Sequence, residues 1–359
     1  MLITSLSLQS FRSYESCLFS PGSGINLLIG ENAQGKTNLL EAVFYCCFGR
    51  SHRTAKDKDL IAYDKDEARI TLHSVKTETA HKLQIRLSQE QGRQIRADDL
   101  PLSRIGDLMG LLNCVLFAPE HLSIVKEGPA ERRRFMDMEL SQTYPAYFFV
   151  LQQYMRVLRQ RNILLKSLKE QPELMQTLPV WNQQLASNGF KLMQYREAFC
   201  QHLSHLAQEN HRDISGGIET LNVSYTPDCD VQDEQELLER IERAQREDFR
   251  RYTTTVGPHR DEMALNLDGR EIRSFGSQGQ IRTAALALKL SELDLIRKET
   301  GEWPILMLDD VMSELDDKRQ QYLLERILPV QTFVTTTMEG VRWPEAKRFT
   351  VEKGTVTES

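Results

Sequence analysis

Two short stretches carry residues whose types and spacing could do chemistry. The first, Gly30–Thr37 (GENAQGKT), has the G-x-x-x-x-G-K-T spacing of a phosphate-binding loop and follows the apolar run Ile25–Ile29 directly. Its glycines allow a tight turn that aims backbone N–H groups at phosphate oxygens, and the following helix points its positive end at the same anion. Lys36 is expected to reach the β- and γ-phosphates of a nucleotide, and Thr37 to ligate Mg²⁺. The expected cofactor-binding residues of this loop are Gly30, Glu31, Asn32, Ala33, Gln34, Gly35, Lys36 and Thr37.

The second stretch, Ile305–Asp310 (ILMLDD), is a buried-strand pattern that ends in two carboxylates. Asp309 is expected to hold Mg²⁺ together with Thr37, which offsets phosphate charge. Asp310 is expected to orient or deprotonate the attacking water. The expected catalytic residues are therefore Lys36, Asp309 and Asp310.

A third motif opens a long predicted helix with the sequence Ser277-Gln278-Gly279-Gln280. Serine and glycine at a helix start favour a second anion site, although a single such site could be only a capping turn. Ser277, Gly279 and Gln280 become nucleotide candidates because the motif stands between the other two in the chain. Asp316, shortly after the second carboxylate, is expected to lie close enough to sense the nucleotide. Threonines 335–337 could touch the γ-phosphate.

Alternating and apolar patterns predict the elements that position these motifs. The helix Thr37–Gly49 follows the phosphate loop, and strand signals vanish between Ala130 and His211, where apolar residues recur at helical steps. The predicted strands are Leu2–Leu8, Glu15–Ser20, Ile25–Ile29, Ala68–His73, Lys82–Leu87, Gln94–Ala97 and Cys114–Ala118.

The charge of the chain limits where it could bind nucleic acid. A net charge of −6 and a pI near 5.9 mean that such binding must come from a local patch. Residues 121–170 hold nine Lys and Arg against five Asp and Glu, which is +4 locally. The basic loop Gly49–Lys58 is a second candidate, although a solvated connection explains it equally well. The candidate DNA contacts are Arg50, His52, Arg53, Arg132, Arg133 and Arg134.

The cysteines and the start of the chain bear on its compartment. Six cysteines show no C-x-x-C or metal-ligand spacing, which is typical of reduced thiols in a cytosol. Met1 leads directly into a strand-like alternation, and the longest apolar run, Val43–Phe48, is too short to span a bilayer. We expect a cytoplasmic protein.

Together the motifs resemble those of the SMC group of ABC-type ATPase heads: Walker A at Gly30–Thr37, a signature at Ser277–Gln280, Walker B at Ile305–Asp310 and a D-loop at Ser313–Asp316. Further segments resemble, more narrowly, the RecF family of bacterial DNA replication and repair proteins. These segments are Ser10–Tyr14, Gly49–Arg53, Phe117–Glu120, Gly128–Asp137, Gly257–Asp261 and Phe349–Gly354.

The resemblance implies an α/β fold, an SMC/RecN-like P-loop ATPase head with a mixed sheet, and a helical arm inserted between Walker A and the signature. We place the head at residues 1–125 and 215–359 and the arm at 126–214. The resemblance also implies that ATP, bound with Mg²⁺, joins two copies of the chain. Ser277 and Gly279 would then face the γ-phosphate held by the other copy, and Arg12 would contact the nucleotide phosphates.

For function, the resemblance implies a DNA-dependent ATPase of recombinational repair that binds duplex, single-stranded or gapped DNA. It further implies partnership with RecO and RecR, help in loading RecA, and a role in the SOS response. Transporter-type heads carry a glutamate and a histidine where this chain has Asp310 and a threonine, so we expect slow, switch-like turnover. The segment Phe117–Glu120 is equivalent to the Q-loop of such heads but contains no glutamine.

Three other functions fit parts of this pattern. They are an ATP-binding clamp without useful hydrolysis, the cytosolic ATPase subunit of a transporter, and a P-loop kinase. The separation of 240 positions from Thr37 to Ser277 disfavours a compact transporter subunit. A P-loop kinase would leave the helix start at Ser277 unexplained.

Overall fold

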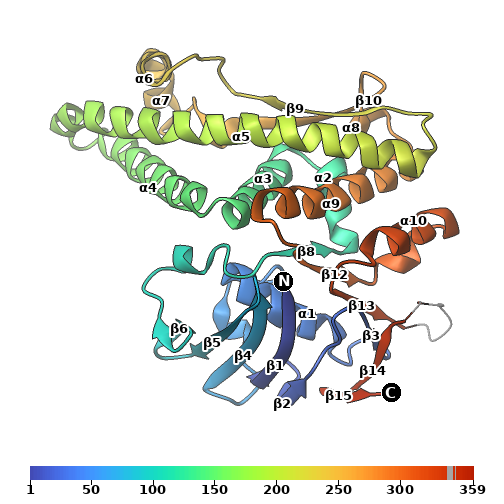
Figure 1. Cartoon of the computed structure of the whole chain (residues 1–359). Coiled ribbons are helices and arrows are strands. Elements are labelled where there is room, and N and C mark those ends of the chain that lie inside the picture. Colours follow the sequence, from blue (N-terminus) through green and yellow to red (C-terminus); the bar gives the residue numbers. More distant parts are fainter. Residues whose placement is uncertain (338–342, 344) are drawn as a thin grey trace. The chain divides into compact units, whose positions relative to one another are not determined.

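The computed structural model describes residues 1–337, 343 and 345–359 and divides the chain into two compact units (Figure 1). The first unit comprises Met1–Leu122 and Ala285–Ser359, and the second comprises Ser123–Ala284. This confirms an α/β head interrupted by an inserted unit.

A mixed six-stranded sheet lies at the centre of the first unit, in the order β15-β14-β3-β13-β12-β8. All neighbouring pairs are parallel except β14 with β15, and all five residues of β12 are buried, as expected for a strand covered on both faces. Parallel strands place β3 and β12 with their carboxyl ends at one edge, so the phosphate loop and Asp309 meet there. The strands are β3 (Ile25–Ile29), β8 (Cys114–Phe117), β12 (Ile305–Asp309), β13 (Thr332–Thr336), β14 (Lys347–Glu352) and β15 (Thr355–Glu358).

The first unit also contains an antiparallel sheet in the order β2-β1-β4-β5-β6-β7. Buried and more exposed residues alternate along β4, so one side of the sheet enters the core and the other faces solvent. Its strands are β1 (Leu2–Phe11), β2 (Tyr14–Phe19), β4 (Glu67–Lys76), β5 (Thr79–Ser88), β6 (Gly92–Ala97) and β7 (Leu100–Pro101). The helices of this unit are α1 (Lys36–Phe48), α10 (Asp317–Ile327) and short 3-10 turns at Asp57–Leu60, Ile105–Leu108, Pro119–Leu122 and Val311–Glu314.

The second unit is built around the 38-residue helix α5 (Leu178–Ser215), which packs on α4 (Pro145–Ser167). A small sheet of β9, β10 and β11 also packs on α5. Its other elements are α2 (Ser123–Lys126), α3 (Pro129–Thr143), β9 (Leu221–Thr226), α6 (Glu234–Arg243), α7 (Gln245–Arg251), β10 (Glu262–Leu267), β11 (Arg270–Glu271), α8 (Ile272–Phe275) and 3-10 turns at Pro172–Thr177 and Pro258–Arg260. Helix α9 (Gln278–Thr300) begins in this unit and ends in the first.

The predicted boundaries of the insertion therefore differ from those in the structure. The second unit begins at Ser123 rather than 126 and ends at Ala284 rather than 214. The returning strands were expected to rejoin the head, but β9 buries Leu221 and Val223 in the packing against α5. Among the described residues, no helix combines the length and apolar character that a bilayer crossing requires.

Candidate nucleotide-binding site

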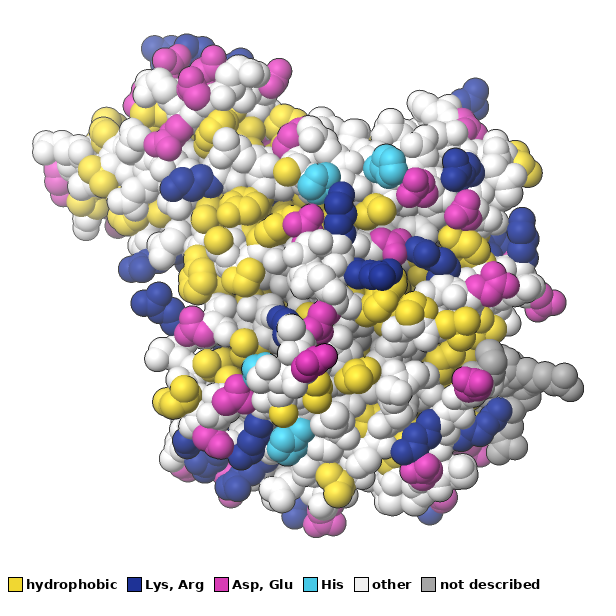
Figure 2. Space-filling model, viewed as in Figure 1, with side chains coloured by type: hydrophobic (Ala, Val, Ile, Leu, Met, Phe, Trp, Pro, Cys, Tyr) yellow, Lys and Arg dark blue, Asp and Glu magenta, His cyan; other side chains and the backbone are white. Residues whose placement is uncertain are grey.

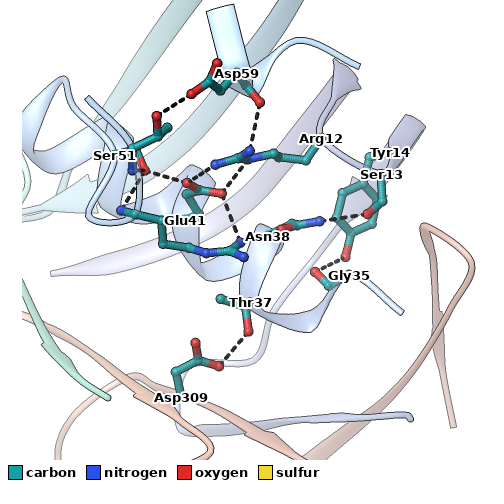
Figure 3. Close-up of polar contacts among 12 residues, drawn as sticks. Arg12, Ser13, Tyr14, Gly35, Thr37, Asn38, Glu41, Ser51, Asp59 and Asp309 are labelled. Carbon is teal, nitrogen blue, oxygen red and sulfur yellow. Dashed lines mark hydrogen bonds and ion pairs between the residues drawn. The ribbon is translucent and has the colours of Figure 1, made fainter. Parts of the chain in front are cut away.

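The phosphate loop has the backbone that its glycines predict. Gly35 caps α1 at φ 116°, and a Cβ there would lie 2.9 Å from Ser13 Oγ, so only glycine fits both the dihedral and the space. The Tyr14 hydroxyl donates to the Gly35 carbonyl at 3.0 Å (Figure 3). Glu31, Asn32 and Ala33 are exposed, which leaves the outer rim of the loop accessible to a ligand.

A turn near the C-terminus supports the same loop. The backbone N–H of Lys353 donates to the Gln34 Oε1 at 2.7 Å, and that of Gly354 donates to the Gln34 carbonyl at 3.2 Å. The resemblance had included this turn without assigning it a role. The structure shows that it holds the loop from a position more than 300 residues away in the chain.

Lys36 lies inside the loop with 4% of its surface exposed. Its Nζ donates to the carbonyls of Gly30 and Glu31 at 2.5 and 2.9 Å. Burial lowers the pKa of Lys36, while the nearby carboxylates of Asp310 and Asp309 act in the opposite direction. Backbone carbonyls of the loop thus fix the position of the ammonium.

Thr37 and Asp309 meet although they come from different elements. The Thr37 hydroxyl donates to Asp309 Oδ1 at 3.0 Å (Figure 3). The Thr335 hydroxyl donates to the same oxygen at 2.7 Å. Burial raises the pKa of Asp309, and both hydroxyls oppose that shift. A hydroxyl and a carboxylate at this spacing are oxygen ligands that suit Mg²⁺, so the residues present fit an ATP–Mg²⁺ complex.

Asp310 follows the strand in the left-handed region, at φ 52°. Its backbone N–H donates to the Thr335 hydroxyl at 2.9 Å, so one threonine binds to both acidic residues. Such backbone strain is commonly found at functional sites, where surrounding contacts maintain it. The structure thus shows Thr335 positioning Asp309 and Asp310, and a contact of one of the threonines 335–337 with the γ-phosphate stays a prediction.

Arg12 binds the buried glutamate Glu41, for which the sequence predicts no role. Its Nε and Nη2 donate to the two Glu41 oxygens at 2.8 and 2.7 Å, and its Nη1 donates to the Asp59 carbonyl at 2.8 Å (Figure 3). Glu41 is fully buried on α1 and also accepts from the Ser51 hydroxyl at 2.5 Å. The sequence signal for this pair is that Glu41, an acidic residue, lies among the apolar residues of the predicted helix Thr37–Gly49. The role of Arg12 in phosphate binding stays a prediction.

The pairing of Glu41 makes the stability of the fold depend on pH. Burial raises its pKa, but hydrogen bonds from Arg12 and Ser51 and the charges of Arg12 and Arg53 outweigh burial and leave the pKa below its ordinary 4.5. A lowered pKa contributes stability that is present above pH 4.5 and is lost as pH falls through the folded-state value. We expect Glu41→Gln to lower the free energy of unfolding by about 1–3 kcal/mol at pH 7, with the difference shrinking below pH 4.5.

Urea unfolding of both proteins between pH 3 and 8 would measure this effect. Glu90→Gln, at an exposed turn, is the matched control and should show no such pattern. A Glu41→Gln deficit that stays constant down to pH 3 would contradict the assignment.

The structure removes two of the proposed DNA contacts. Arg132 is 4% exposed, and its guanidinium pairs with Glu262 at 2.7 Å, so it is a structural residue and not a surface cation. Both ring nitrogens of His52 are buried without a hydrogen-bond partner in the described part of the chain, and its ring packs on Phe44. Burial lowers the pKa of His52, which further disfavours a cationic role.

The other proposed DNA contacts remain at the surface to different degrees. Arg133 is half-buried and donates to the Asp261 carbonyl at 2.7 Å, whereas Arg50, Arg53 and Arg134 are exposed. Arg161, one of the nine cations in the predicted basic segment, is fully buried. Net charge counted along the chain therefore overestimated the positive surface of residues 121–170.

The helix start at Ser277 is exposed and ordered by reciprocal capping. The Ser277 N–H donates to Gln280 Oε1 at 2.6 Å, and the Gln280 N–H donates to the Ser277 Oγ at 3.3 Å. Gln280 Nε2 donates to Glu219 at 2.7 Å, a partner that the sequence did not indicate. Gly279 is half-buried in the first turn of α9.

Asp316 occupies a helix cap. Its Oδ1 accepts from the backbone N–H of Arg319 at 3.0 Å, at the start of α10. Capping α10 is the role that the structure shows for Asp316. The expected contact of Asp316 with a nucleotide stays a prediction.

Comparisons with known proteins identify the family of the chain. The family model for the RecF/RecN/SMC N terminal domain matches residues 2–351. The DNA replication and repair protein RecF of Alkaliphilus oremlandii is 43% identical over 99% of this chain and 100% of its own length. RecF of Geobacillus sp. (strain WCH70) is 42% identical over 99% of both chains.

Solved structures support the same family and fold. The structure of the recombination mediator protein RecF-ATPrS in the RecFOR pathway has a TM-score of 0.94 and 33% identity, covering 99% of this chain and 98% of that one. The Smc head bound to the C-winged helix domain of ScpA shares the fold, with a TM-score of 0.58 at 14% identity over 100% and 97%. By sequence and by fold, the chain belongs to the RecF family of SMC-like, ABC-type ATPase heads.

Proposed function

We propose that the chain is an ATP-dependent DNA-binding protein of DNA replication and recombinational repair, in which ATP binding joins two copies and slow hydrolysis separates them. The convergence of Lys36, Thr37 and Asp309 in the first unit carries the proposal. RecF relatives at 33% identity have been solved with ATP, which supports ATP as the nucleotide.

In this mechanism each residue has one task. ATP with Mg²⁺ would supply a phosphoryl group, and its transfer to water would end the ATP-bound state. Lys36 and the loop N–H groups would bind the β- and γ-phosphates, while Thr37 and Asp309 would hold the metal. Asp310 orients the attacking water, and its short side chain makes turnover slow. Ser277 and Gly279 of a second copy contact the γ-phosphate from the other side, which links assembly to the triphosphate.

The biological setting follows from the family. We extend to this chain the RecFOR pathway of its relatives, with RecO and RecR as partners, help in loading RecA, support of the SOS response, and a cytoplasmic location. DNA in duplex, single-stranded or gapped form is the proposed substrate. An ATP-binding clamp without useful hydrolysis is the second candidate, since Asp310 replaces the usual glutamate.

Light scattering and fluorescence anisotropy would test the proposal. We expect the chain to dimerise with ATP and not with ADP, and to bind DNA more tightly with ATP, with affinity falling as salt rises. The absence of salt-dependent, ATP-stimulated DNA binding would overturn it. Comparing gapped, duplex and single-stranded DNA would also define the preferred form.

Glu219 is predicted to support assembly by fixing Gln280. Glu219→Ala removes a charged acceptor from Gln280 Nε2 and frees the amide that caps Ser277, so we expect ATP-dependent dimerisation to weaken by about 10- to 100-fold. Glu219→Gln keeps an acceptor oxygen and should stay within a few-fold of the wild type. Sedimentation with ATP would measure both variants, and equal dimerisation of Glu219→Ala and wild type would contradict the role.

A further inference from the structure

The solvent side of the antiparallel sheet carries an ordered group of cations. In the register of β4, β5 and β6, Arg69 lies opposite Arg86, and Thr71 lies opposite Gln84, which lies opposite Arg96. Lys82 lies further along β5 on the same side. The neighbouring residues Ile70, Ile85 and Ile95 are buried, so alternation turns the polar set to solvent. We call Arg69, Thr71, Lys82, Gln84, Arg86 and Arg96 the basic sheet face.

This face is hollowed and visible at the surface. A hollow of about 520 Å³ is lined by Arg69, Thr71, Gln84, Arg86 and Arg96 among others. Figure 2 shows Lys and Arg side chains gathered at the lower left, over the strands that Figure 1 labels β5 and β6. The side chains of Arg69 and Arg86 are 56% and 39% exposed.

The charges on the face do not cancel. One carboxylate, that of Glu67, pairs with both Arg69 and Arg86, at 2.7 and 2.5 Å, and Asp99 pairs with Lys82 at 2.9 Å. Arg96 donates to the backbone carbonyl of Asp99, at 2.5 and 3.1 Å, and so keeps its full charge. The four cations and the two carboxylates that pair with them sum to +2 on a chain whose net charge is −6. The adjoining Asp98 carboxylate pairs with His81 and accepts from the Lys82 backbone N–H.

We propose that the basic sheet face binds the phosphate backbone of DNA. This inference rests on the proposed function and names the surface that performs its DNA-binding step. Arginine forks match phosphate oxygens in two-point contacts, and Thr71 and Gln84 add neutral donors between them. The pairs with Glu67 are exposed and therefore weak, so a phosphate can replace the carboxylate without disturbing the core.

Substitutions of opposite sign test the proposal. The triple variant Arg69→Ala, Arg86→Ala, Arg96→Ala should reduce the slope of log affinity against log salt on duplex DNA by about 2.7, at about 0.9 for each lost contact. Its affinity should then fall about 40-fold less than that of the wild type between 50 and 200 mM salt. Glu67→Gln removes the competing carboxylate and should raise DNA affinity at low salt several-fold.

A charge-matched control separates local contact from net charge. Arg212→Ala, Arg243→Ala, Arg250→Ala removes three exposed cations from the second unit and should leave the salt slope unchanged. ATP affinity, measured calorimetrically, should be unchanged in all variants because these residues lie outside the nucleotide site. If the triple variant of the basic sheet face misfolds, the change in DNA affinity of Glu67→Gln tests the proposal instead.

The outcomes distinguish the surface from the function. If the wild type binds DNA and the sheet triple matches the control triple, the basic sheet face is not the DNA surface, and the proposed function stands. If the sheet triple loses an acidic protein partner while DNA binding is unchanged, the inference is also overturned. If the wild type itself binds no DNA, the proposed function and this inference both fail.

Discussion

Lys36→Ala is expected to lower ATP affinity by about 10²- to 10³-fold, and with it ATP-dependent dimerisation and DNA binding. Lys36 is 4% exposed as a residue, and its ammonium donates to the Gly30 and Glu31 carbonyls, so its contacts with phosphate would form largely away from bulk water. Removing one pre-positioned charged donor from such a site costs roughly 3–4 kcal/mol. Isothermal titration with ATP would measure the loss, and exposed Lys56→Ala is the control.

Asp310→Asn should separate binding from hydrolysis. Because Asp310 is assigned to water and not to phosphate, ATP affinity and ATP-dependent dimerisation should remain near wild type while turnover falls by about 10²-fold or more. ATP-driven dimers of this variant should therefore persist longer. If Asp310→Asn and Lys36→Arg both retain DNA-dependent ATP turnover, the assigned site does not hydrolyse ATP, and the clamp without hydrolysis becomes the better description.

Asp248→Ala is expected to destabilise the second unit by about 3–5 kcal/mol. Its carboxylate pairs at 2.7 Å with Arg161, and the two side chains are 1% and 0% exposed, so the substitution would leave an arginine buried without its counter-charge. Asp248 also accepts from the N–H and hydroxyl of Thr255, at 2.8 and 2.6 Å. Urea unfolding followed by circular dichroism would measure the change.

A double variant provides the control for this prediction. Arg161→Met with Asp248→Leu removes both charges together and should recover most of the lost stability, since a buried pair can be replaced by apolar side chains at little cost. Glu239→Ala, at a partly exposed position on α6, should change stability by less than about 0.5 kcal/mol. A double variant as unstable as Asp248→Ala would show that the loss comes from packing and not from the unpaired charge.

Local signals in the sequence predicted the strand and the helix on either side of the phosphate loop well. The strand Ile25–Ile29 coincides with β3, and the helix after the loop ends before Gly49, where the chain adopts φ 58°. Backbone turns, helix starts and buried strands depend on residues within one or two turns of each other, so a short window contains their causes. The family assignment and the fold class, which rested on such windows, are confirmed.

The sequence by itself determined the chemistry that this chain can hold: a glycine loop with Lys36 and Thr37, an acidic strand end, and a capped helix start at Ser277. Only the tertiary structure decided which charges are available. Arg132 and Arg161 are buried in pairs with Glu262 and Asp248, and the second unit extends to Ala284. Arg12 pairs with Glu41 while its side chain stays partly exposed. These outcomes depend on pairs as far as 130 residues apart, because burial and desolvation are set by whatever element packs alongside, and a count of charges along the chain contains no such information.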